Sequence, residues 1–151
     1  MQKRFYQTTI GESINDLLPL LKTHYEEVSI YSKFGHEFKP DIDLYIAASK
    51  AGSLKTYVLE VEGMIAGYVM YSISLHPHCK KLVIGMMDMI YLDPKFRNLG
   101  LGQELMKYAE EDLKLLKVNY IFAAMTEHFD FTKTMDALNY KLADKLFVKG
   151  V

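Results

Sequence analysis

A strand, a glycine loop and a long helix follow one another between Met87 and Lys117. The apolar run Leu82–Leu92 is typical of a strand, and Pro94 ends it because proline has no N–H for a sheet ladder. Gly100 and Gly102 then open a helix. Its apolar residues recur at helical spacing: Leu101, Leu105, Ala109, Leu113 and Leu116. This order of elements favours a fold in which helices pack on a sheet.

The start of that helix is suited to bind phosphate. Its first N–H groups have no partner within the helix, and the aligned peptide dipoles add partial positive charge there. Glycine at positions 100 and 102 would let a phosphate approach the backbone, because no Cβ stands in the way. Arg97 would add a cation with a planar donor fork. We interpret the stretch as a diphosphate site; the alternative is a turn whose glycines only let helix and strand pack closely.

Two common phosphate loops do not fit this stretch. The sequence has no Gly, four residues, then Gly-Lys-Ser/Thr, as a Walker loop requires. The dinucleotide-binding pattern requires a third glycine where this chain has Leu105. The pattern present is Arg-x-x-Gly-x-Gly, shortly after the pair Asp93-Pro94 that ends the strand.

That combination resembles the acetyl-CoA loop of the GNAT superfamily of acyl-CoA N-acyltransferases. The resemblance implies acetyl-CoA as cofactor and a pantetheine arm that pairs with the strand backbone at Ile90, Tyr91 and Leu92. It implies a diphosphate held by the loop residues Arg97, Asn98, Leu99, Gly100, Leu101 and Gly102. A narrower resemblance, to GNAT proteins encoded by tailed bacteriophages, rests on the His-x-His loop, the Asp88 strand and the C-terminal residues from Leu138 to Lys149.

Length and composition predict one soluble domain over residues 1–151, since 50% of the residues are hydrophobic and 25% are charged. A net charge of −1 gives no electrostatic case for nucleic-acid or membrane binding. The single cysteine, Cys79, excludes an internal disulfide and a multi-cysteine zinc site, and favours a reducing cytoplasm. The polar start Met1–Thr9 is unlike a signal peptide, and no apolar run approaches the roughly 20 residues that span a bilayer.

The periodicity predicts a mixed α/β (α+β) sheet with helices on its faces. The first helix is expected after Gly11, with Ser13 as N-cap and Asp16 as its capping partner, and should end near Val28. Expected strands are Lys3–Ile10, Leu54–Val61, Met64–Leu75, Lys81–Leu92, Val118–Thr126 and Leu142–Val148. Further helices are expected from Pro40 to Gly52, from Gly100 to Lys117 and over Phe131–Leu138, with loops at Ser29–Lys39 and Glu127–Asp130, and with Asn139 in a turn at positive φ.

This order matches the GNAT fold, in which a central, mostly antiparallel, twisted sheet carries two splayed strands. The resemblance implies that Lys81–Leu92 and Val118–Thr126 are those strands and that the pantetheine arm enters between them.

Asp88 is an acid inside an otherwise apolar strand. An ionised carboxylate buried there costs on the order of several kcal/mol unless it is paired or hydrogen-bonded. Such a site raises the pKa of a carboxylate, which suits a general base at neutral pH. Many GNAT enzymes place an acid on this strand for that task. We interpret Asp88 as the catalytic base; a structural carboxylate or a role in shaping the acceptor pocket is the alternative.

The general acid is where the sequence departs from the family. The resemblance implies a tyrosine five residues before the aromatic residue of the turn at Asn139-Tyr140, and that position is Met135, which has no proton to donate. An asparagine used by other members would align near His128. Tyr140 and His128 are weaker substitutes, and release of the thiolate with help from water is the remaining route.

His76 and His78 precede the Asp88 strand and are candidate contacts for the acceptor substrate. No further ligand cluster accompanies the pair, so no metal site is expected. A solvated loop is the simpler interpretation. The aromatic segment Tyr31–Phe38 is a second candidate wall of the acceptor pocket or, alternatively, ordinary core.

Together these features predict an N-acetyltransferase that moves an acetyl group from acetyl-CoA to a primary amine by direct attack in a ternary complex. The acceptor would be a small molecule, or a lysine or N-terminus of a protein. The alternative is a catalytically weak acyl-CoA-binding module that acts through a protein partner. Dimers are common in the family, so a homodimer is one alternative, and the sequence leaves the oligomeric state open. The expected location is a bacterial cytoplasm or that of an infected host.

Overall fold

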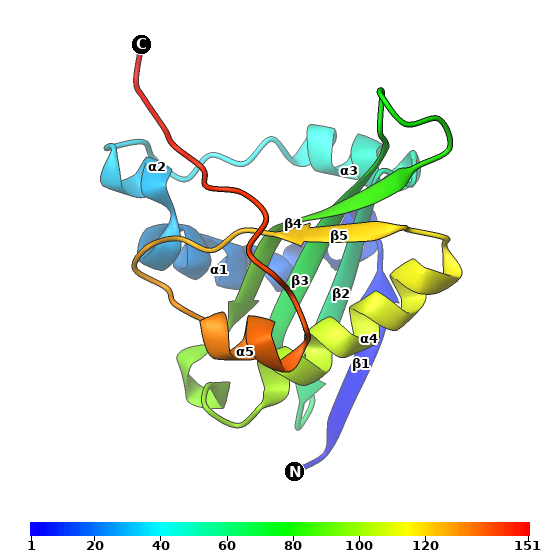
Figure 1. Cartoon of the computed structure of the whole chain (residues 1–151). Coiled ribbons are helices and arrows are strands. Elements are labelled where there is room, and N and C mark those ends of the chain that lie inside the picture. Colours follow the sequence, from blue (N-terminus) through cyan, green and yellow to red (C-terminus); the bar gives the residue numbers. More distant parts are fainter.

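A computed structural model of the protein describes residues 1–151. Five strands form one sheet in the order β1-β2-β3-β4-β5, with bounds Lys3–Thr8, Leu54–Val61, Met64–Leu75, Val83–Leu92 and Tyr120–Ala123. Strands β1 to β4 pair with one another antiparallel, and β5 runs parallel to β4 (Figure 1). The predicted mixed, mostly antiparallel sheet is therefore confirmed.

Helices cover both faces of this sheet (Figure 1). The helices are α1 (Ile10–Val28), α2 (Ile30–Lys33), α3 (Ile42–Lys50), α4 (Leu101–Leu115) and α5 (Thr132–Ala137), and a 3₁₀ turn spans Pro94–Phe96. On one face, α4 buries Leu101, Leu105 and Leu113 against Tyr57 and Met87 of the sheet. Truncating one such buried leucine to alanine costs about 2–5 kcal/mol, so α4 is held firmly behind the glycine loop.

The other face is covered by α1 and α3. A second cluster there joins Ile10 and Leu17 of α1 to Val58, Met70 and other strand residues, with partly buried side chains of α3 packed against it. Alternation along the strands explains the two clusters, because successive side chains point to opposite faces. The two layers fix α1 and α4 on either side of β4.

The first helix begins at Ile10, so the prediction of Ser13 as its N-cap is wrong. Thr9 is the N-cap, and its side chain and the Glu12 side chain form a reciprocal capping box. Ser13 lies inside the helix, where its hydroxyl donates to the Thr9 carbonyl at 2.8 Å. Thr9-x-x-Glu12 satisfies two terminal N–H groups at once, which an Asp16 partner cannot do from that position.

Several predicted elements match the structure closely. The hairpin of β2 and β3 has the predicted bounds, with Glu62 and Gly63 in the turn at positive φ. Asp41 caps α3 by accepting from the Leu44 N–H at 3.0 Å, and Gly52 follows that helix at a φ of 76°. Asn139 adopts a φ of 62°, as its turn requires.

Other elements are shorter than predicted or differ. The predicted loop Ser29–Lys39 contains α2, and β5 is confined to Tyr120–Ala123. The predicted strand Leu142–Val148 is wrong: the last eleven residues, 141–151, have no helix or strand. Their backbone makes no hydrogen bond, and their chain end stands clear of the sheet (Figure 1). A strand-like sequence forms a strand only where its backbone pairs with a neighbouring strand, and these residues pair with neither free edge of the sheet.

Candidate active site

Strands β4 and β5 pair over only part of their length. Their register runs from Ile84↔Tyr120 to Met87↔Ala123 and ends there. The last residues of β4, from Asp88 to Leu92, therefore have β3 on one side and no strand on the other. The predicted splayed strands are confirmed, and the opening begins beside Asp88.

The backbone of β4 presents hydrogen-bonding groups to that opening. The N–H of Asp93 donates to the Ala66 carbonyl on β3 at 2.8 Å. Since backbone groups alternate between the two sides of a strand, those of Leu92 and Ile90 face the open side. The position of Arg97 agrees, because its Nε donates to the Leu92 carbonyl at 3.0 Å. The Tyr91 backbone faces β3, and its side chain is 2% exposed in the core on the α1 side.

Asp88 lies at a β-bulge. In the register of β3 and β4, Met70 pairs with Met89 and Tyr71 with Met87, so Asp88 has no partner. A bulge of this kind bends the strand and redirects the side chain that it carries. The bulge and the end of the β4–β5 pairing thus coincide at the one acidic residue of β4.

The Asp88 carboxylate is more open than the apolar sequence predicted, because Asp88 lies at an exposed position of β4, as Met86 does two residues earlier. Its Oδ1 accepts from the Ser72 hydroxyl at 3.1 Å, whereas Oδ2 accepts no hydrogen bond from the protein. Partial burial against the surrounding walls raises the pKa of Asp88 above its ordinary value, and the Ser72 hydrogen bond opposes this. A carboxylate with one free oxygen and a raised pKa is suited to take a proton.

The loop after β4 has an unpaired row of donors. None of the backbone N–H groups from Asn98 to Gln103 donates a hydrogen bond within the protein. Gly100 is the N-cap of α4, at a φ of 76°, and no side chain caps the helix. A bound diphosphate needs several N–H donors at a helix start, and these residues supply them. The loop therefore fits the diphosphate group that the sequence predicted.

Gly102 serves packing as well. A Cβ built on Gly102 would lie 3.2 Å from Cδ1 of Leu92, tighter than an ordinary contact. A Cβ on Gly100 would meet nothing within 4 Å, so Gly100 is required for its positive φ alone. The packing explanation therefore applies to Gly102, whereas Gly100 is explained by its backbone conformation.

Arg97 makes an ion pair that the sequence did not reveal. Its Nη1 and Nη2 donate to the two carboxylate oxygens of Glu27 on α1, at 2.7 and 2.8 Å. The Tyr91 hydroxyl also donates to Glu27. The guanidinium carbon lies 4.8 Å from the ring centre of Phe129. The hydrogen bond from Arg97 lowers the pKa of Glu27, so this carboxylate stays ionised.

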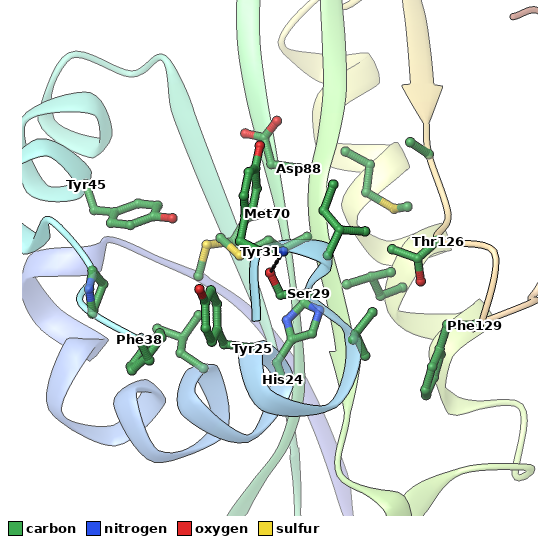
Figure 2. Close-up of a pocket in the computed structure, with 18 of the residues that line it drawn as sticks. His24, Tyr25, Ser29, Tyr31, Phe38, Tyr45, Met70, Asp88, Thr126 and Phe129 are labelled. Atoms are coloured by element: carbon green, nitrogen blue, oxygen red, sulfur yellow. Dashed lines mark hydrogen bonds between the residues drawn. The ribbon is translucent and has the colours of Figure 1, made fainter. Parts of the chain in front are cut away.

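A cavity of about 750 Å³ lies between α1, the segment that follows it and the splayed strands (Figure 2). Asp88 and Ile90 line it from β4, and Thr126 and Phe129 line it beyond β5. Four aromatic side chains line the side formed by α1 to α3: Tyr25, Tyr31, Phe38 and Tyr45. This volume is in the range of small-molecule sites, and the predicted aromatic wall is part of it.

Three lining or neighbouring residues were missed in the sequence. His24 lies on the cavity wall, with its Nδ1 2.6 Å from the Tyr68 hydroxyl, and burial lowers its pKa to about 4. The Thr126 hydroxyl is buried without a hydrogen-bond partner. Glu27 balances Arg97. In the sequence, only the polar character of His24 and Glu27 within an amphipathic helix indicated a role in a site. Exposure of these two residues to solvent explained that character equally well.

Other predicted residues lie elsewhere. His76 and His78 are in the β3–β4 turn and do not line the cavity; their rings are 5.7 Å apart. Met135 is buried in the cluster on the α4 side. Tyr140 donates its hydroxyl to Glu110 at 2.7 Å, and His128 is exposed outside the cavity lining.

Two general features of the chain bear on the kind of site. No group of three or more histidine, cysteine, aspartate or glutamate side chains could hold a metal ion. None of the helices has the length and apolar character that crossing a membrane requires.

Known proteins resemble this chain in fold. A ribosomal-protein-alanine N-acetyltransferase from Brucella melitensis biovar Abortus 2308 aligns with a TM-score of 0.74 and 14% identity, over 99% of both chains. An aminoglycoside acetyltransferase from an uncultured soil metagenomic sample, in complex with sisomicin, aligns with a TM-score of 0.75 and 11% identity, over 99% of this chain and 94% of that one. A predicted acetyltransferase from Clostridium acetobutylicum, in a structure with acetyl-CoA, aligns with a TM-score of 0.73 and 13% identity, over 99% of this chain and 96% of that one.

At these identities the structural likeness establishes the fold. A comparison with curated protein sequences found no match. The model of the acetyltransferase (GNAT) family matches residues 17–131, which include Asp88, the glycine loop and the cavity residues His24 and Tyr25 of α1. Because this match spans more than half of the chain, the protein belongs to the GNAT family of acetyltransferases.

Proposed function

We propose that the protein transfers an acetyl group from acetyl-CoA to a primary amine by direct attack in a ternary complex. One observation carries the proposal. The unpaired N–H row at Asn98–Gln103 and the open edge of β4 lead toward the cavity in which Asp88 lies. A long donor with a diphosphate at one end and an acyl group at the other fits such a path.

Backbone groups would hold the diphosphate and the pantetheine arm of acetyl-CoA. The N–H groups of Asn98, Leu99, Gly100, Leu101 and Gly102 would hold the diphosphate. The open-side groups of Ile90 and Leu92 would pair with the amides of the pantetheine arm, as a neighbouring strand would. Tyr91 supports this edge from the core side, and Arg97 fixes the loop through Glu27.

Asp88 would act as the general base. When bound, acetyl-CoA supplies an acetyl thioester. The amine nitrogen forms a bond to the acetyl carbon while the bond from that carbon to sulfur breaks. The proton lost by the nitrogen goes to Asp88, directly or through water, and the thiolate takes a proton from solvent. A carboxylate of raised pKa is matched to this task, because a stronger base accepts the proton more readily.

The matched test of Asp88 uses two variants that each neutralise one carboxylate. Asp88→Asn should lower the rate of thiol release from acetyl-CoA by about 10²–10⁴-fold, the range of general-base catalysis. Glu111→Gln, at an exposed position of α4 outside the cavity, should leave it unchanged. Both should bind acetyl-CoA alike in a thermal-shift titration. An equal loss of binding and turnover in Asp88→Asn would assign the carboxylate to structure instead.

A specific observation favours the alternative of a weak catalyst that binds acyl-CoA and acts through a protein partner. Met135 is buried away from the cavity, and neither Tyr140 nor His128 lines it, so none of the three proposed positions puts a proton donor beside the cavity. If any amine causes thiol release from acetyl-CoA well above the rate of acetyl-CoA hydrolysis, the protein is not only a binding module. Binding of acetyl-CoA without such release for a broad amine panel would support it.

A homodimer and a cytoplasmic location are also proposed. The chain leaves Leu142, Leu146 and Phe147 between 86% and 90% exposed, and the outer edge of β5 has no strand neighbour. Exposed apolar residues of this kind mark interaction surfaces. Sedimentation of the wild type and of Phe147→Asp would test the dimer, which the charged variant should weaken. The location is supported by Cys79, an exposed free cysteine that reducing compartments keep reduced.

A further inference from the structure

The cavity wall carries few charged side chains. Besides Asp88, the charged residues that line it are Glu37 and Lys39, and these pair with each other at 2.7 Å on the exposed rim. Two histidines also line the cavity, His24 and His36, and burial lowers the pKa of His24 to about 4, which leaves it neutral at pH 7. Asp88 is therefore the one unpaired carboxylate on the wall, with Oδ2 free to accept a hydrogen bond. A wall of this kind balances a single ammonium group.

The rest of the wall is apolar and aromatic. Hydrophobic residues make up 18 of the 26 that line the cavity. On the side of α1 to α3, Tyr25, Tyr31, Phe38 and Tyr45 surround the space beside Asp88 (Figure 2). Burial raises the pKa of Tyr45, and the charge of Asp88 adds to this effect. Aromatic faces attract a cation and bury an apolar body.

The aromatic wall is held in place before any ligand binds. The Tyr25 hydroxyl donates to the His36 carbonyl at 2.9 Å. The rings of Tyr25 and Phe38 lie 5.4 Å apart, and Asp41 caps the helix that follows. These contacts tie the segment between α2 and α3 to α1. A preformed wall costs little ordering on binding, so its shape selects among acceptors.

We infer that the acceptor is a small primary amine with one positive charge on an aromatic or branched aliphatic body, bound with its nitrogen at Asp88 and its body among Tyr31, Phe38 and Tyr45. This inference rests on the proposed acetyl transfer. A polycationic amino sugar fits poorly, since one carboxylate cannot balance several ammonium groups and apolar walls cannot satisfy many hydroxyl groups. A peptide N-terminus carries the polar backbone groups that this wall leaves without partners.

The first test compares acceptors on the full chain with acetyl-CoA. Thiol release is measured with 2-phenylethylamine, ethanolamine, sisomicin and an unblocked alanyl tripeptide. We expect kcat/KM for 2-phenylethylamine to exceed that for ethanolamine by about 10- to 100-fold, because only the former buries an apolar body. Preference for sisomicin or the tripeptide, or equal values for the first two amines, would overturn the inference.

The second test uses two aromatic residues of equal exposure. Tyr31 and Phe34 are each 58% exposed in the same segment, but only Tyr31 lines the cavity. Tyr31→Ala should lower kcat/KM for 2-phenylethylamine several-fold and leave ethanolamine nearly unchanged, whereas Phe34→Ala should affect neither. Equal effects of both variants, or of Tyr31→Ala on both amines, would overturn the assignment of the wall.

A separate measurement distinguishes failure of this inference from failure of the proposed function. Acetyl-CoA should raise the melting temperature of the protein, since a ligand that binds only the folded state stabilises it. A thermal shift with thiol release for the wrong amine class would overturn the inference and leave acetyl transfer standing. No shift at millimolar acetyl-CoA, together with no thiol release for any amine, would overturn both.

Discussion

Arg97 and Glu27 form a two-pronged ion pair between the glycine loop and α1, with nitrogen–oxygen distances of 2.7 and 2.8 Å. The side chains of the pair are 23% and 31% exposed, so water screens them only in part. Because Glu27 neutralises the guanidinium, the charge of Arg97 is not free to meet a diphosphate. The unpaired N–H groups of Asn98–Gln103 are then the main anion-binding donors, and Arg97 acts by fixing the loop.

This ion pair predicts that a second substitution, at Glu27, restores the acetyl-CoA affinity that a substitution at Arg97 removes. Arg97→Met leaves the Glu27 carboxylate unbalanced near the diphosphate and should weaken binding about tenfold or more, by like-charge repulsion. Adding Glu27→Gln removes that charge and should restore most of the affinity. Titration of the single and double variants with acetyl-CoA measures both steps. If Arg97 instead contacts the phosphate directly, the double variant will bind as weakly as Arg97→Met.

Gly100 offers a second prediction, with a matched glycine elsewhere. Gly100 and Gly52 both have a φ of 76°, and a Cβ on either would meet no atom within 4 Å. Alanine at either position should therefore cost about 1–2 kcal/mol of stability through its left-handed backbone. Only Gly100→Ala should also weaken acetyl-CoA binding, because it shifts the N–H donors at the start of α4.

The measurements are thermal unfolding and acetyl-CoA titration of both variants. A comparable loss of stability with unchanged affinity in Gly100→Ala would mean that the loop is structural only. Gly102 is less informative here, since its Cβ would press on Leu92 at 3.2 Å and disturb packing as well as binding.

Much of the fold could be predicted because its signals are local. The β2–β3 hairpin, the helix that starts after Pro40 and the positive φ of Asn139 depend on residues within a few positions of one another. The glycine loop is local in the same sense, since the strand end, two glycines and an amphipathic helix are adjacent. Tertiary contacts then decided the bounds: β5 is short because β4 diverges from it after Met87.

The site could be predicted only in part, because its decisive contacts join distant residues. Glu27 and Arg97 lie 70 positions apart, and nothing in either neighbourhood reveals the pair. The unpaired position of Asp88 depends on a bulge set by the register of β3, which the sequence of one strand does not reveal. The prediction of the C-terminal strand failed for another reason: Leu142–Val148 has the pattern of a strand, but its backbone pairs with neither free edge of the sheet.

Thr126 supports a third prediction. Its buried hydroxyl has no hydrogen-bond partner and lines the cavity beyond β5, where the cofactor arm would enter. An unsatisfied buried hydroxyl costs about 1–3 kcal/mol, which a partner on the bound cofactor would recover. Thr126→Val should therefore stabilise the free protein and weaken acetyl-CoA binding or turnover.

Thr56 is the matched control for that variant. Its hydroxyl is likewise buried without a partner, but it lies in β2 and does not line the cavity. Thr56→Val should stabilise the protein and leave activity as in the wild type, as measured by thermal unfolding and steady-state kinetics. Equal kinetics in both variants would remove Thr126 from the cofactor path.

His24 makes the stability of the fold depend on pH in a defined range. Burial lowers its pKa from 6.5 to about 4, while the unfolded chain keeps the ordinary value. Between these pH values the unfolded state binds more protons, so the free energy of unfolding falls as the pH decreases from 6.5 to about 4. The loss should be on the order of a few kcal/mol. Glu27, whose pKa is lowered below 4.5, loses its contribution only under more acidic conditions.

His24→Gln should therefore flatten the pH dependence in that range. Glutamine does not titrate, and it can still accept from the Tyr68 hydroxyl that lies 2.6 Å from His24. Melting temperatures of the wild type and the variant, measured from neutral pH down to about 4, should converge or cross as the wild type loses stability. If His24 contributed only by packing, the two curves would run parallel at every pH. Convergence would instead show that the cavity wall keeps this imidazole neutral beside Asp88, the only unpaired carboxylate facing the acceptor.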